Sequence, residues 1–584
     1  MQLQNPKKVL TLRALLISII ISLFLLASSS YIAMKLGALP WPIIFSVIVS
    51  GGLLKIFSRR NSPVTLHEIN AAQAGASVGG LVSAGVVFTF PGIVLLQQQG
   101  IIINFPPFWH FAFIVAVAAT LGVLLSIPMK DTFVEKEQLP YPAGTAGAAL
   151  LKLGETGGRL LVGILVIGAL AGAFALFRDL YFKSGWALES LIPFGIFITL
   201  NPSLLAVSGG YILGKRVGIN WLAGAILGWI FIVPILQQSG FAVKDAIAAT
   251  QNFGMGIVMG SGIAFFILYI LPRAKDIFLP YFTHKRYRVF FPAFTILGIA
   301  ALKILNVPLI AAIIAVLLTW IMVAVAARMT GETNINPLEQ FGIFTGLIIA
   351  GFYAFFSMTL NIEASFIIVA FVSIACAVAG DIGHDFKSAA IIGTPFEHII
   401  RIDFITALCS GLAAPLVFEL IYRTFQHDFF TAAMPAPQAA MVAGSIRGFA
   451  HPFAFAGGFV LAFFAETILH FLADQYRRKI WLMPLGIGLF LGLGLALPLA
   501  TGGLIRAYMD RRFPDKYTLV LLVAAGIMGG EGLAGFGIAG IVSVGAPFKE
   551  SAQALISLFG LVALVSCAGL WYQSRSRGSH GMPK

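Results

Sequence analysis

The sequence predicts an all-α polytopic membrane protein built from two pseudosymmetric repeats, each containing a re-entrant half-helix. Of its 584 residues, 59% are hydrophobic and only 11% are charged, about half the charged fraction of an average soluble protein. Uncharged apolar runs recur along the whole chain, and short segments of the first half return in the second half in the same order. A soluble fold of this size could not bury so much apolar surface.

The apolar runs have the length of membrane spans. Several are close to the ~20 residues that a helix needs to cross about 30 Å of hydrocarbon, among them 14–34, 160–177, 221–240 and 480–499. They are expected to be helices, because each segment in lipid must satisfy its own backbone hydrogen bonds. A membrane β-barrel would instead show short stretches of alternating polar and apolar residues, a pattern that we do not find.

Basic residues lie mostly between these runs. A net charge of +14 would favour nucleic-acid binding in a soluble protein, but here the charges act as topology signals, so no nucleic-acid partner is expected. Lys7, Lys8 and Arg13 precede the first run and predict a cytoplasmic amino terminus. A cleavable signal peptide is an alternative for this run, although its similarity to a segment of the second half argues against cleavage.

Three pairs of similar segments define the repeats. Residues 139–144 (LPYPAG) match 434–439 (MPAPQA), 35–37 match 329–331, and 208–210 match 501–503. Because the spacing is nearly constant, we predict an amino-terminal transmembrane repeat at 1–290, a carboxy-terminal repeat at 291–573 and a polar tail at 574–584. Spans in the first repeat are placed near 12–34, 40–57, 69–97, 108–129, 160–177, 190–214, 219–237 and 252–272. An extra apolar run at 289–305 leaves open whether the repeats are parallel or inverted.

The matched Pro-x-Pro segments interrupt helical geometry. Pro140, Pro142, Pro435 and Pro437 remove backbone donors and push the preceding residues out of the helical region. We interpret both segments as re-entrant half-helices, which are tolerated at membrane depth only where protein or a water-filled cavity covers the backbone. Paired interrupted helices in two repeats indicate a transport site. A surface loop with a rigid turn is the alternative.

Polar residues inside apolar runs are the candidate functional residues, since a charge at the bilayer centre costs roughly 2.5 to 3.5 kcal/mol. Glu68, Asn70 and Gln73 begin a run rich in alanine and glycine, and Asn70 and Gln73 share one helical face. They could contact a substrate that approaches the small residues, or hydrogen-bond between helices for packing.

A second group is Asp381, His384 and Asp385, followed by Lys387. The first three lie at i, i+3 and i+4, so two carboxylates and an imidazole would project from one helical face, a combination suited to carrying a proton. A cytoplasmic loop in which Lys387 neutralises Asp385 is the alternative. Metal binding is a weaker one, because no second ligand cluster has suitable spacing.

A third group contains Asn334 and Asn336 before a proline, and Glu531 among glycines. Asparagines before a proline indicate a helix break with free carbonyls, and Glu531 lies in an apolar run on a closely approachable backbone. Glu332, in the same break, is better explained as part of a loop. Glu466 is isolated in another apolar run, where it could pair with a basic neighbour.

Several classes of protein are excluded. Cys376, Cys409 and Cys567 lie in apolar stretches without paired spacing, so neither disulfides nor a zinc site is indicated. No phosphate-loop motif occurs, so ATP is not expected to supply the energy. No nucleophile with a base and no His-Glu-x-x-His motif occurs either, so we expect neither an enzyme nor a cofactor. A channel, which would show downhill flux without proton coupling, remains a less favoured alternative.

Several segments together resemble a bacterial member of the oligopeptide transporter family, which includes the yellow stripe-like metal-chelate transporters. They are 31–37, 68–91, 139–149, 201–218, 330–342, 380–395, 434–440 and 529–537. The resemblance implies about sixteen transmembrane helices in a multi-pass protein of the inner (plasma) membrane. It also implies proton-coupled import of short peptides, or of metals carried on peptide-like chelators, and dimers in some members.

We therefore expect a proton-coupled symporter of oligopeptides, with metal-chelate import on the same fold as the alternative. The expected substrate-binding residues are Glu68, Asn70, Gln73, Tyr141, Asn201, Asn334, Asn336 and Gln438. The expected proton-coupling residues are Asp381, His384, Asp385, Lys387 and Glu531. Its partners would be the substrate, protons, the lipid bilayer and a second copy in a homodimer.

Overall fold

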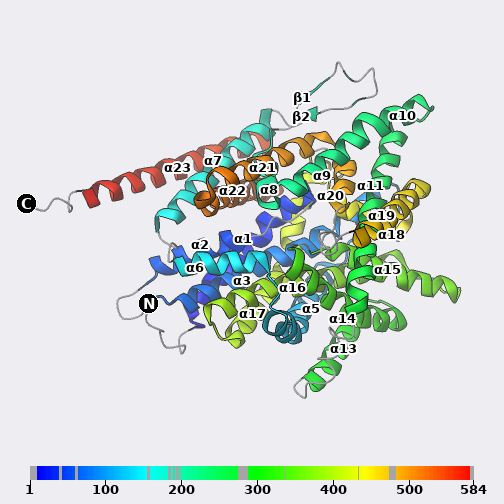
Figure 1. The fold of residues 1–584 in the computed structure, drawn as a ribbon, viewed down its shortest axis with the longest axis horizontal. Coiled ribbons are helices and arrows are strands. Elements are labelled where there is room, and N and C mark those ends of the chain that lie inside the picture. Colours follow the sequence, from blue (N-terminus) through cyan, green and yellow to red (C-terminus); the bar gives the residue numbers. More distant parts are fainter. Residues whose placement is uncertain are drawn as a thin grey trace, which may run out of the picture.

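The computed structural model describes residues 9–578, except for 38–42, 59–62, 154–157, 182–185, 189–190, 192–195, 197–198, 201, 274–286, 335, 432 and 473–481. Its architecture is a bundle of long helices (Figure 1). Among the described residues the only strands are β1 (Trp186–Ala187) and β2 (Thr199–Leu200), which pair antiparallel.

The helices of the first half, with their π-helical and 3-10 turns (η), follow in chain order. They are α1 (Leu12–Leu36), α2 (Ile43–Ile56), α3 (Leu66–Val87), α4 (Pro91–Gln98), α5 (Phe108–Met129), η2 (Lys130–Lys136), α6 (Pro142–Leu153), α7 (Gly158–Tyr181), α8 (Leu204–Leu213), α9 (Lys215–Ile226), η4 (Leu227–Ile232), α10 (Val233–Gln238), α11 (Val243–Phe265), η5 (Phe266–Ile270) and η6 (Leu271–Arg273).

The second half is also helical. It contains α13 (Tyr287–Ile304), α14 (Leu309–Thr333), α15 (Leu338–Phe355), α16 (Ile362–Ile392), α17 (Phe396–Phe425), α18 (Pro437–Arg447), α19 (Pro452–Leu472), α20 (Met483–Leu491), α21 (Leu493–Arg512), η7 (Pro514–Lys516), α22 (Tyr517–Ser543) and α23 (Phe548–Gly578). α23 runs beside α7 along one edge of the molecule (Figure 1) and ends inside the segment 574–584.

Within the described residues, 13 helical segments are long and apolar enough to cross a membrane, and three shorter apolar helices lie at 45–56, 204–213 and 292–304. The prediction of an all-α polytopic membrane protein is therefore confirmed. The total of about sixteen spans stays a prediction.

Some predicted runs are not single helices; 69–97 is divided at residues 88–90 between α3 and α4. In 190–214, β2 lies at Thr199–Leu200, and Ser203 caps the start of α8 by accepting a hydrogen bond from the Ala206 N–H over 3.1 Å. The run 480–499 is divided at Gly492, whose φ of +74° ends α20. A residue with a side chain would be strained there, and its Cβ would lie 2.8 Å from the Trp229 ring. Hydrophobicity shows neither break.

α16 lies in the middle of the bundle and packs against α3, α5, α6, α14, α15 and α17 (Figure 1). Small residues permit this close packing. A Cβ on Gly85 of α3 would lie 2.6 Å from Ile374 of α16, and one on Gly122 of α5 would lie 2.7 Å from the Ala375 carbonyl oxygen. The alanine- and glycine-rich sequence of α3 thus brings its polar residues against α16.

The two Pro-x-Pro segments lead into short helices. α6 has 12 residues and α18 has 11, so each extends about 16 to 18 Å, roughly half of the 30 Å hydrocarbon core. This length fits the half-helix interpretation. The first segment contacts the end of α14, and the second contacts the end of α1: Tyr141 N–H donates to the Gly331 carbonyl, and Ala436 N–H donates to the Met34 carbonyl. Each segment thus contacts a helix end from the other half of the chain, and the two-repeat arrangement stays a prediction.

Candidate functional site

The second polar group lies inside the helix bundle. Asp381, His384 and Asp385 are at most 6% exposed and belong to the continuous helix α16. They are therefore not in a loop, which was the alternative interpretation. The helix continues through this segment because its residues pack on α3, α5 and α14.

α3 supplies hydrogen-bond donors to Asp385. Gln73 Nε2 donates to Asp385 Oδ1 over 3.3 Å, and Ser77 Oγ donates to Asp385 Oδ2 over 3.1 Å. Gln73 and Ser77 lie one turn apart on α3, so both reach the same carboxyl group. The other amide atom of Gln73, Oε1, is buried and has no hydrogen-bond partner among the described residues.

Asn70 joins α3 to the end of α16. Its Nδ2 donates to Thr394 Oγ1 over 3.0 Å, and its Oδ1 accepts from Ser388 Oγ over 2.6 Å. Asn70 and Gln73 lie against the α16 face, as their shared helical face predicts. Both polar atoms of the Asn70 amide, however, already form hydrogen bonds with protein side chains.

The first Pro-x-Pro segment and the start of α6 contact His384. The Gly144 N–H donates to His384 Nδ1 over 3.2 Å, and the Tyr141 ring lies edge-on to the imidazole with centroids 5.4 Å apart. Because a backbone N–H can only donate, this nitrogen is unprotonated. Tyr141 also donates its hydroxyl to the Ala327 carbonyl over 2.9 Å, and Lys387 Nζ donates to the Gln138 carbonyl over 3.3 Å.

Asp381 faces the break after α14. Thr330 and Asn336 provide polar side-chain atoms beside its carboxyl group. Asn336 Nδ2 donates to the Cys376 carbonyl over 3.0 Å, whereas its Oδ1 has no hydrogen-bond partner in the part of the chain that the structure describes. Asn334 is more exposed and accepts the Ala143 N–H through Oδ1 over 3.3 Å. The third sequence group thus lies around the second.

Asp403, which the sequence analysis missed, belongs to the same region. It lies on α17, is 0% exposed, and interacts electrostatically with Asp385. Neither of its carboxyl oxygens has a hydrogen-bond partner within the described residues. Its signal in the sequence is a lone acid in the largely apolar run 402–418, which a test of every acid in such runs would have found.

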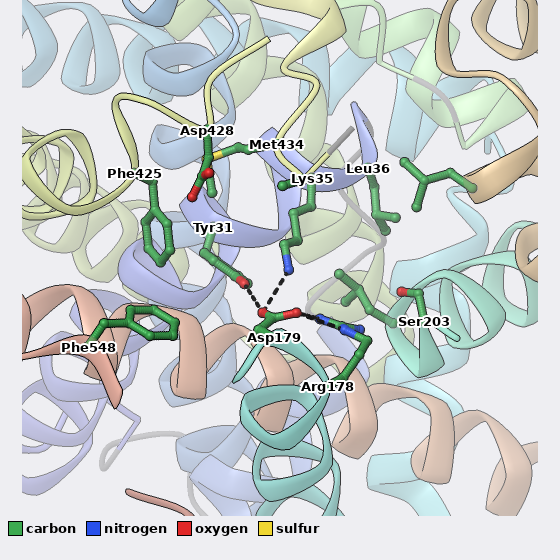
Figure 2. A pocket seen from close by; sticks show the side chains of 13 residues that line it. Tyr31, Lys35, Leu36, Arg178, Asp179, Ser203, Phe425, Asp428, Met434 and Phe548 are labelled. Carbon is green, nitrogen blue, oxygen red and sulfur yellow. Dashed lines mark hydrogen bonds and ion pairs between the residues drawn. The ribbon is translucent and has the colours of Figure 1, made fainter. Parts of the chain in front are cut away.

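Glu531 lies in a separate ionic network. Arg178 Nη2 is 2.8 Å from Glu531 Oε1, and the Leu205 N–H donates to Glu531 Oε2 over 3.2 Å. Arg178 also binds Asp179, whose Oδ2 accepts from Lys35 Nζ and the Tyr31 hydroxyl, each over 3.3 Å (Figure 2). The sequence analysis proposed Glu531 but missed this pairing, which joins α1, α7, α8 and α22.

Of the remaining predicted site residues, Glu68 and Gln438 bind other parts of the protein, and Asn201 cannot be placed. Arg13 holds Glu68 with two hydrogen bonds of 2.6 and 2.7 Å, and Thr11 also donates to it. Gln438 Nε2 donates to the Gly37 carbonyl over 2.7 Å. Asn201 lies outside the described residues.

A ligand-sized cavity lies beside the second Pro-x-Pro segment. Its volume is about 470 Å³, within the usual range for ligand pockets. It is lined by α4, α11, α18 and the loop that contains Pro435, with Gln99, Gln251 and Asn252 as its amide side chains. The side chains that the structure places on this lining carry no formal charge. The cavity bordered by Lys35 and Asp179 is only about 40 Å³ (Figure 2), room for a water molecule or two.

The family profile described as OPT oligopeptide transporter protein matches residues 9–269 and 284–542, which is most of the chain. The chain belongs to the oligopeptide transporter family. This confirms the resemblance read from the sequence motifs.

Relatives of this chain include a protein named as an oligopeptide transporter and proteins named as metal-chelate transporters. A Haemophilus influenzae protein provisionally named an oligopeptide transporter is 31% identical over 223 residues, 37% of this chain and only 34% of that protein. Iron-phytosiderophore transporter yellow stripe 1 of Zea mays is 24% identical over 73% of this chain and 72% of its own. Metal-nicotianamine transporter YSL2 of Oryza sativa subsp. japonica is 24% identical with the same coverage.

Proposed function

We propose that this protein is a proton-coupled secondary transporter that imports short peptides, with metal chelates as the alternative substrates. Its family membership supports transport. The observation that supports ion coupling is Asp385, a carboxyl group buried in the middle of the bundle. Among the residues that the structure describes, its side-chain hydrogen-bond donors are the neutral Gln73 and Ser77. An ionisable side chain inside a membrane span, without a basic partner, marks an ion or proton pathway.

The proposed coupling residues are those of the α16 face. Asp381, His384 and Asp385 would exchange the proton, and Lys387 lies one turn beyond His384, near the first Pro-x-Pro segment. Glu531 is the other candidate. Its ion pair with Arg178 would first have to break. We therefore assign Glu531 to opening and closing the ionic network that Arg178 forms with Asp179 and Lys35 (Figure 2), rather than to carrying a proton by itself.

Among the predicted substrate contacts, Gln73 and Asn336 are the strongest candidates, because each has a buried amide oxygen that finds no hydrogen-bond partner within the described part of the chain. Tyr141, Asn334 and Asn70 would position the half-helix and α3 around the substrate path. Asn201 is proposed from its sequence motif alone. Glu68 and Gln438 bind other parts of the protein in this conformation.

The uncharged cavity beside Pro435 favours the metal-chelate alternative. A peptide with a free amino and a free carboxylate terminus would bring two charges to a lining of amides and apolar groups, which is costly without pairing. In a metal chelate the carboxylates already bind the metal, so less charge is left to desolvate. The longer matches to yellow stripe transporters also favour this alternative.

Mechanistically, we propose alternating access, in which one repeat or bundle moves against the other around a fixed site. Each half-helix contacts the end of a helix from the opposite half, so it can transmit such a movement. We further propose that the protein lies in the inner membrane with a cytoplasmic amino terminus and forms a homodimer. Labelling of single cysteines from either side, and the mass of the detergent-solubilised protein, test these points.

The function is tested by uptake into proteoliposomes. Trialanine and a nickel–nicotianamine complex are offered separately, with and without an inwardly directed pH gradient. Accumulation of either probe above the external concentration only in the presence of the gradient is expected. Gradient-independent, purely downhill flux of both would instead identify a channel, and the probe that accumulates decides between peptide and chelate.

A further inference from the structure

The cavity beside Pro435 is lined by a buried side chain that lacks a hydrogen-bond donor. Asn252 of α11 belongs to this lining and is only 5% exposed. Its Nδ2 donates to the Ala248 carbonyl over 2.6 Å, but its Oδ1 finds no hydrogen-bond partner among the described residues. Such an acceptor is unfavourable, because it has lost its hydration without gaining a donor. A ligand with an N–H group would supply the missing hydrogen bond.

Two further carboxamides lie on the same lining. Gln99, just after α4, is exposed, whereas Gln251, next to Asn252 in the chain, is partly buried. Gln251 Nε2 donates to the Phe490 carbonyl over 3.3 Å, which holds α11 against the end of α20. A carboxamide offers both N–H donors and a carbonyl acceptor. The polar part of the lining therefore matches ligand groups that also carry a donor beside an acceptor.

Aromatic rings form much of the remaining wall. Trp229 of the π-helical turn η4 is held there by its indole N–H, which donates to the Leu489 carbonyl over 3.0 Å. Three phenylalanine rings also line the cavity, those of Phe430, Phe449 and Phe490. Apolar and aromatic walls with a few polar groups that orient the ligand are typical of small-molecule sites. These walls favour a flat ligand with apolar side groups.

The lining does not match the charged termini of a linear peptide. The side chains that the structure places on it carry no formal charge. An ammonium or carboxylate group that entered would lose hydration without meeting an opposite charge. A cyclic dipeptide has neither terminus, because its peptide bonds close a small ring. Each of these bonds is a cis amide, which presents its N–H and its C=O on the same edge, as a carboxamide does.

We propose that the cavity beside Pro435 binds cyclic dipeptides, with Asn252 Oδ1 accepting a hydrogen bond from a ring N–H. This inference rests on the proposed import of short peptides and narrows it to peptides without charged termini. The amide edge of the ring meets the carboxamides of the lining, and its faces lie against the aromatic walls.

A ligand in this cavity also contacts the second half-helix. Ala440 and Gly444 of α18 belong to the lining, and their small side chains leave space for the ring. The start of α18 is tied to the end of α1, where Gln438 Nε2 donates to the Gly37 carbonyl over 2.7 Å. Binding is therefore placed to act on the half-helix that alternating access would move.

The ligand class is tested by isothermal titration of the purified full-length protein. Three probes are compared: cyclo(Ala-Ala), linear dialanine, and the N,N′-dimethyl form of the ring, which has no N–H donor. We expect cyclo(Ala-Ala) to bind at least about tenfold more tightly than either of the others. Equal or tighter binding of dialanine would overturn the inference, because charged termini would then be accepted. Equal binding of the methylated ring would overturn the hydrogen bond to Asn252.

Asn252→Leu keeps the approximate size of the side chain but removes the acceptor. It should weaken the binding of cyclo(Ala-Ala) by about tenfold or more, and undiminished binding would refute the assigned contact. The matched control is Gln340→Leu on α15. Gln340 is also 5% exposed with an Oε1 that lacks a partner within the described chain, but it lies outside this lining, so this variant should bind as wild type does. If Asn252→Leu folds poorly, the methylated ring tests the same contact in the wild-type protein.

Uptake into proteoliposomes separates this inference from the proposed function. Labelled cyclo(Ala-Ala) is offered beside the trialanine and nickel–nicotianamine probes under an inwardly directed pH gradient, and we expect it to accumulate. If another probe accumulates while cyclo(Ala-Ala) neither binds nor accumulates, the inference is wrong and the proposed function stands. If no probe accumulates but cyclo(Ala-Ala) binds through Asn252, proton-coupled import is wrong and the ligand class of the cavity stands.

Discussion

The backbone N–H of Tyr141 donates a 2.9 Å hydrogen bond to the carbonyl oxygen of Gly331, and this contact ties the first half-helix to the second half of the chain. The Ala436 N–H donates a corresponding 2.9 Å hydrogen bond to the Met34 carbonyl oxygen, which ties the second half-helix to the first half of the chain. Tyr141 and Ala436 also share an unusual left-handed backbone, with φ of +37° and +39°. Such a conformation persists only where surrounding contacts enforce it, so each of these two positions is anchored by its contact with the other half of the chain.

The anchor at Tyr141 predicts the effect of a small substitution on α16. In Gly383→Ala the new methyl group would lie 2.1 Å from the Tyr141 ring. The ring must move, and we expect a loss of about 1 to 3 kcal/mol in unfolding free energy, as for other overpacked cores. Thermal unfolding in detergent measures this loss. The control is Gly351→Ala on α15, where nothing lies near the added Cβ. An equal stability of the two variants would contradict the assigned contact.

The ion pair between Arg178 and Glu531 predicts a non-additive pair of mutations. Arg178→Gln leaves the completely buried Glu531 without its cation, and breaking a buried pair in this way costs about 3 to 5 kcal/mol. The double variant Arg178→Gln, Glu531→Gln should recover much of that stability, because no unpaired charge remains. A double-mutant cycle of thermal unfolding checks this, and additive losses would show that the two groups do not act together.

Glu68 should act on stability rather than on substrate affinity. Its carboxylate is already held by Arg13 and Thr11 at the start of α1, so Glu68→Gln loses charge-assisted hydrogen bonds worth about 1.5 to 3 kcal/mol. We expect a lower unfolding temperature with an unchanged KM for the transported probe. A raised KM with unchanged stability would place Glu68 in the substrate path instead.

The cavity beside Pro435 predicts a substitution that blocks substrate. Ala440 lies on its wall, and Ala440→Phe would place a ring in the space. Binding of the accumulated probe should be lost while the protein remains folded, as isothermal titration and thermal unfolding would show. Gly457→Phe on α19, where the Cβ direction is open, is the control for an added ring. Unchanged binding in Ala440→Phe would exclude this cavity as the substrate site.

Asp381→Asn should separate accumulation from exchange. The amide has nearly the same shape as the carboxyl group and can still contact Thr330 and Asn336, but it cannot carry a proton. We expect loss of accumulation driven by a pH gradient and continued exchange at equal pH. An unchanged pH dependence would assign Asp381 a purely structural role at the break after α14.

The sequence by itself determined the class of fold and the family. Hydrophobic runs longer than the bilayer core can only be helices in lipid, because the backbone must satisfy its own hydrogen bonds there, and the prolines of 140–142 and 435–437 mark where those helices break. It also pointed to Asp381, His384 and Asp385, because three ionisable groups on one face of an apolar helix are energetically costly in a membrane and are usually kept for a function. These inferences depend only on local composition and spacing.

The tertiary structure decided which side chain meets which. Glu68 is paired with Arg13 and Glu531 with Arg178, across 55 and 353 residues of chain. The turn of α17 that carries the buried Asp403 lies close to α3 because Gly75 has no side chain. Whether a buried carboxyl group is neutralised or left with unsatisfied oxygens depends on these distant contacts. The charge of a site in a low-dielectric interior is set by the groups that packing brings together. Helical periodicity alone does not identify those groups.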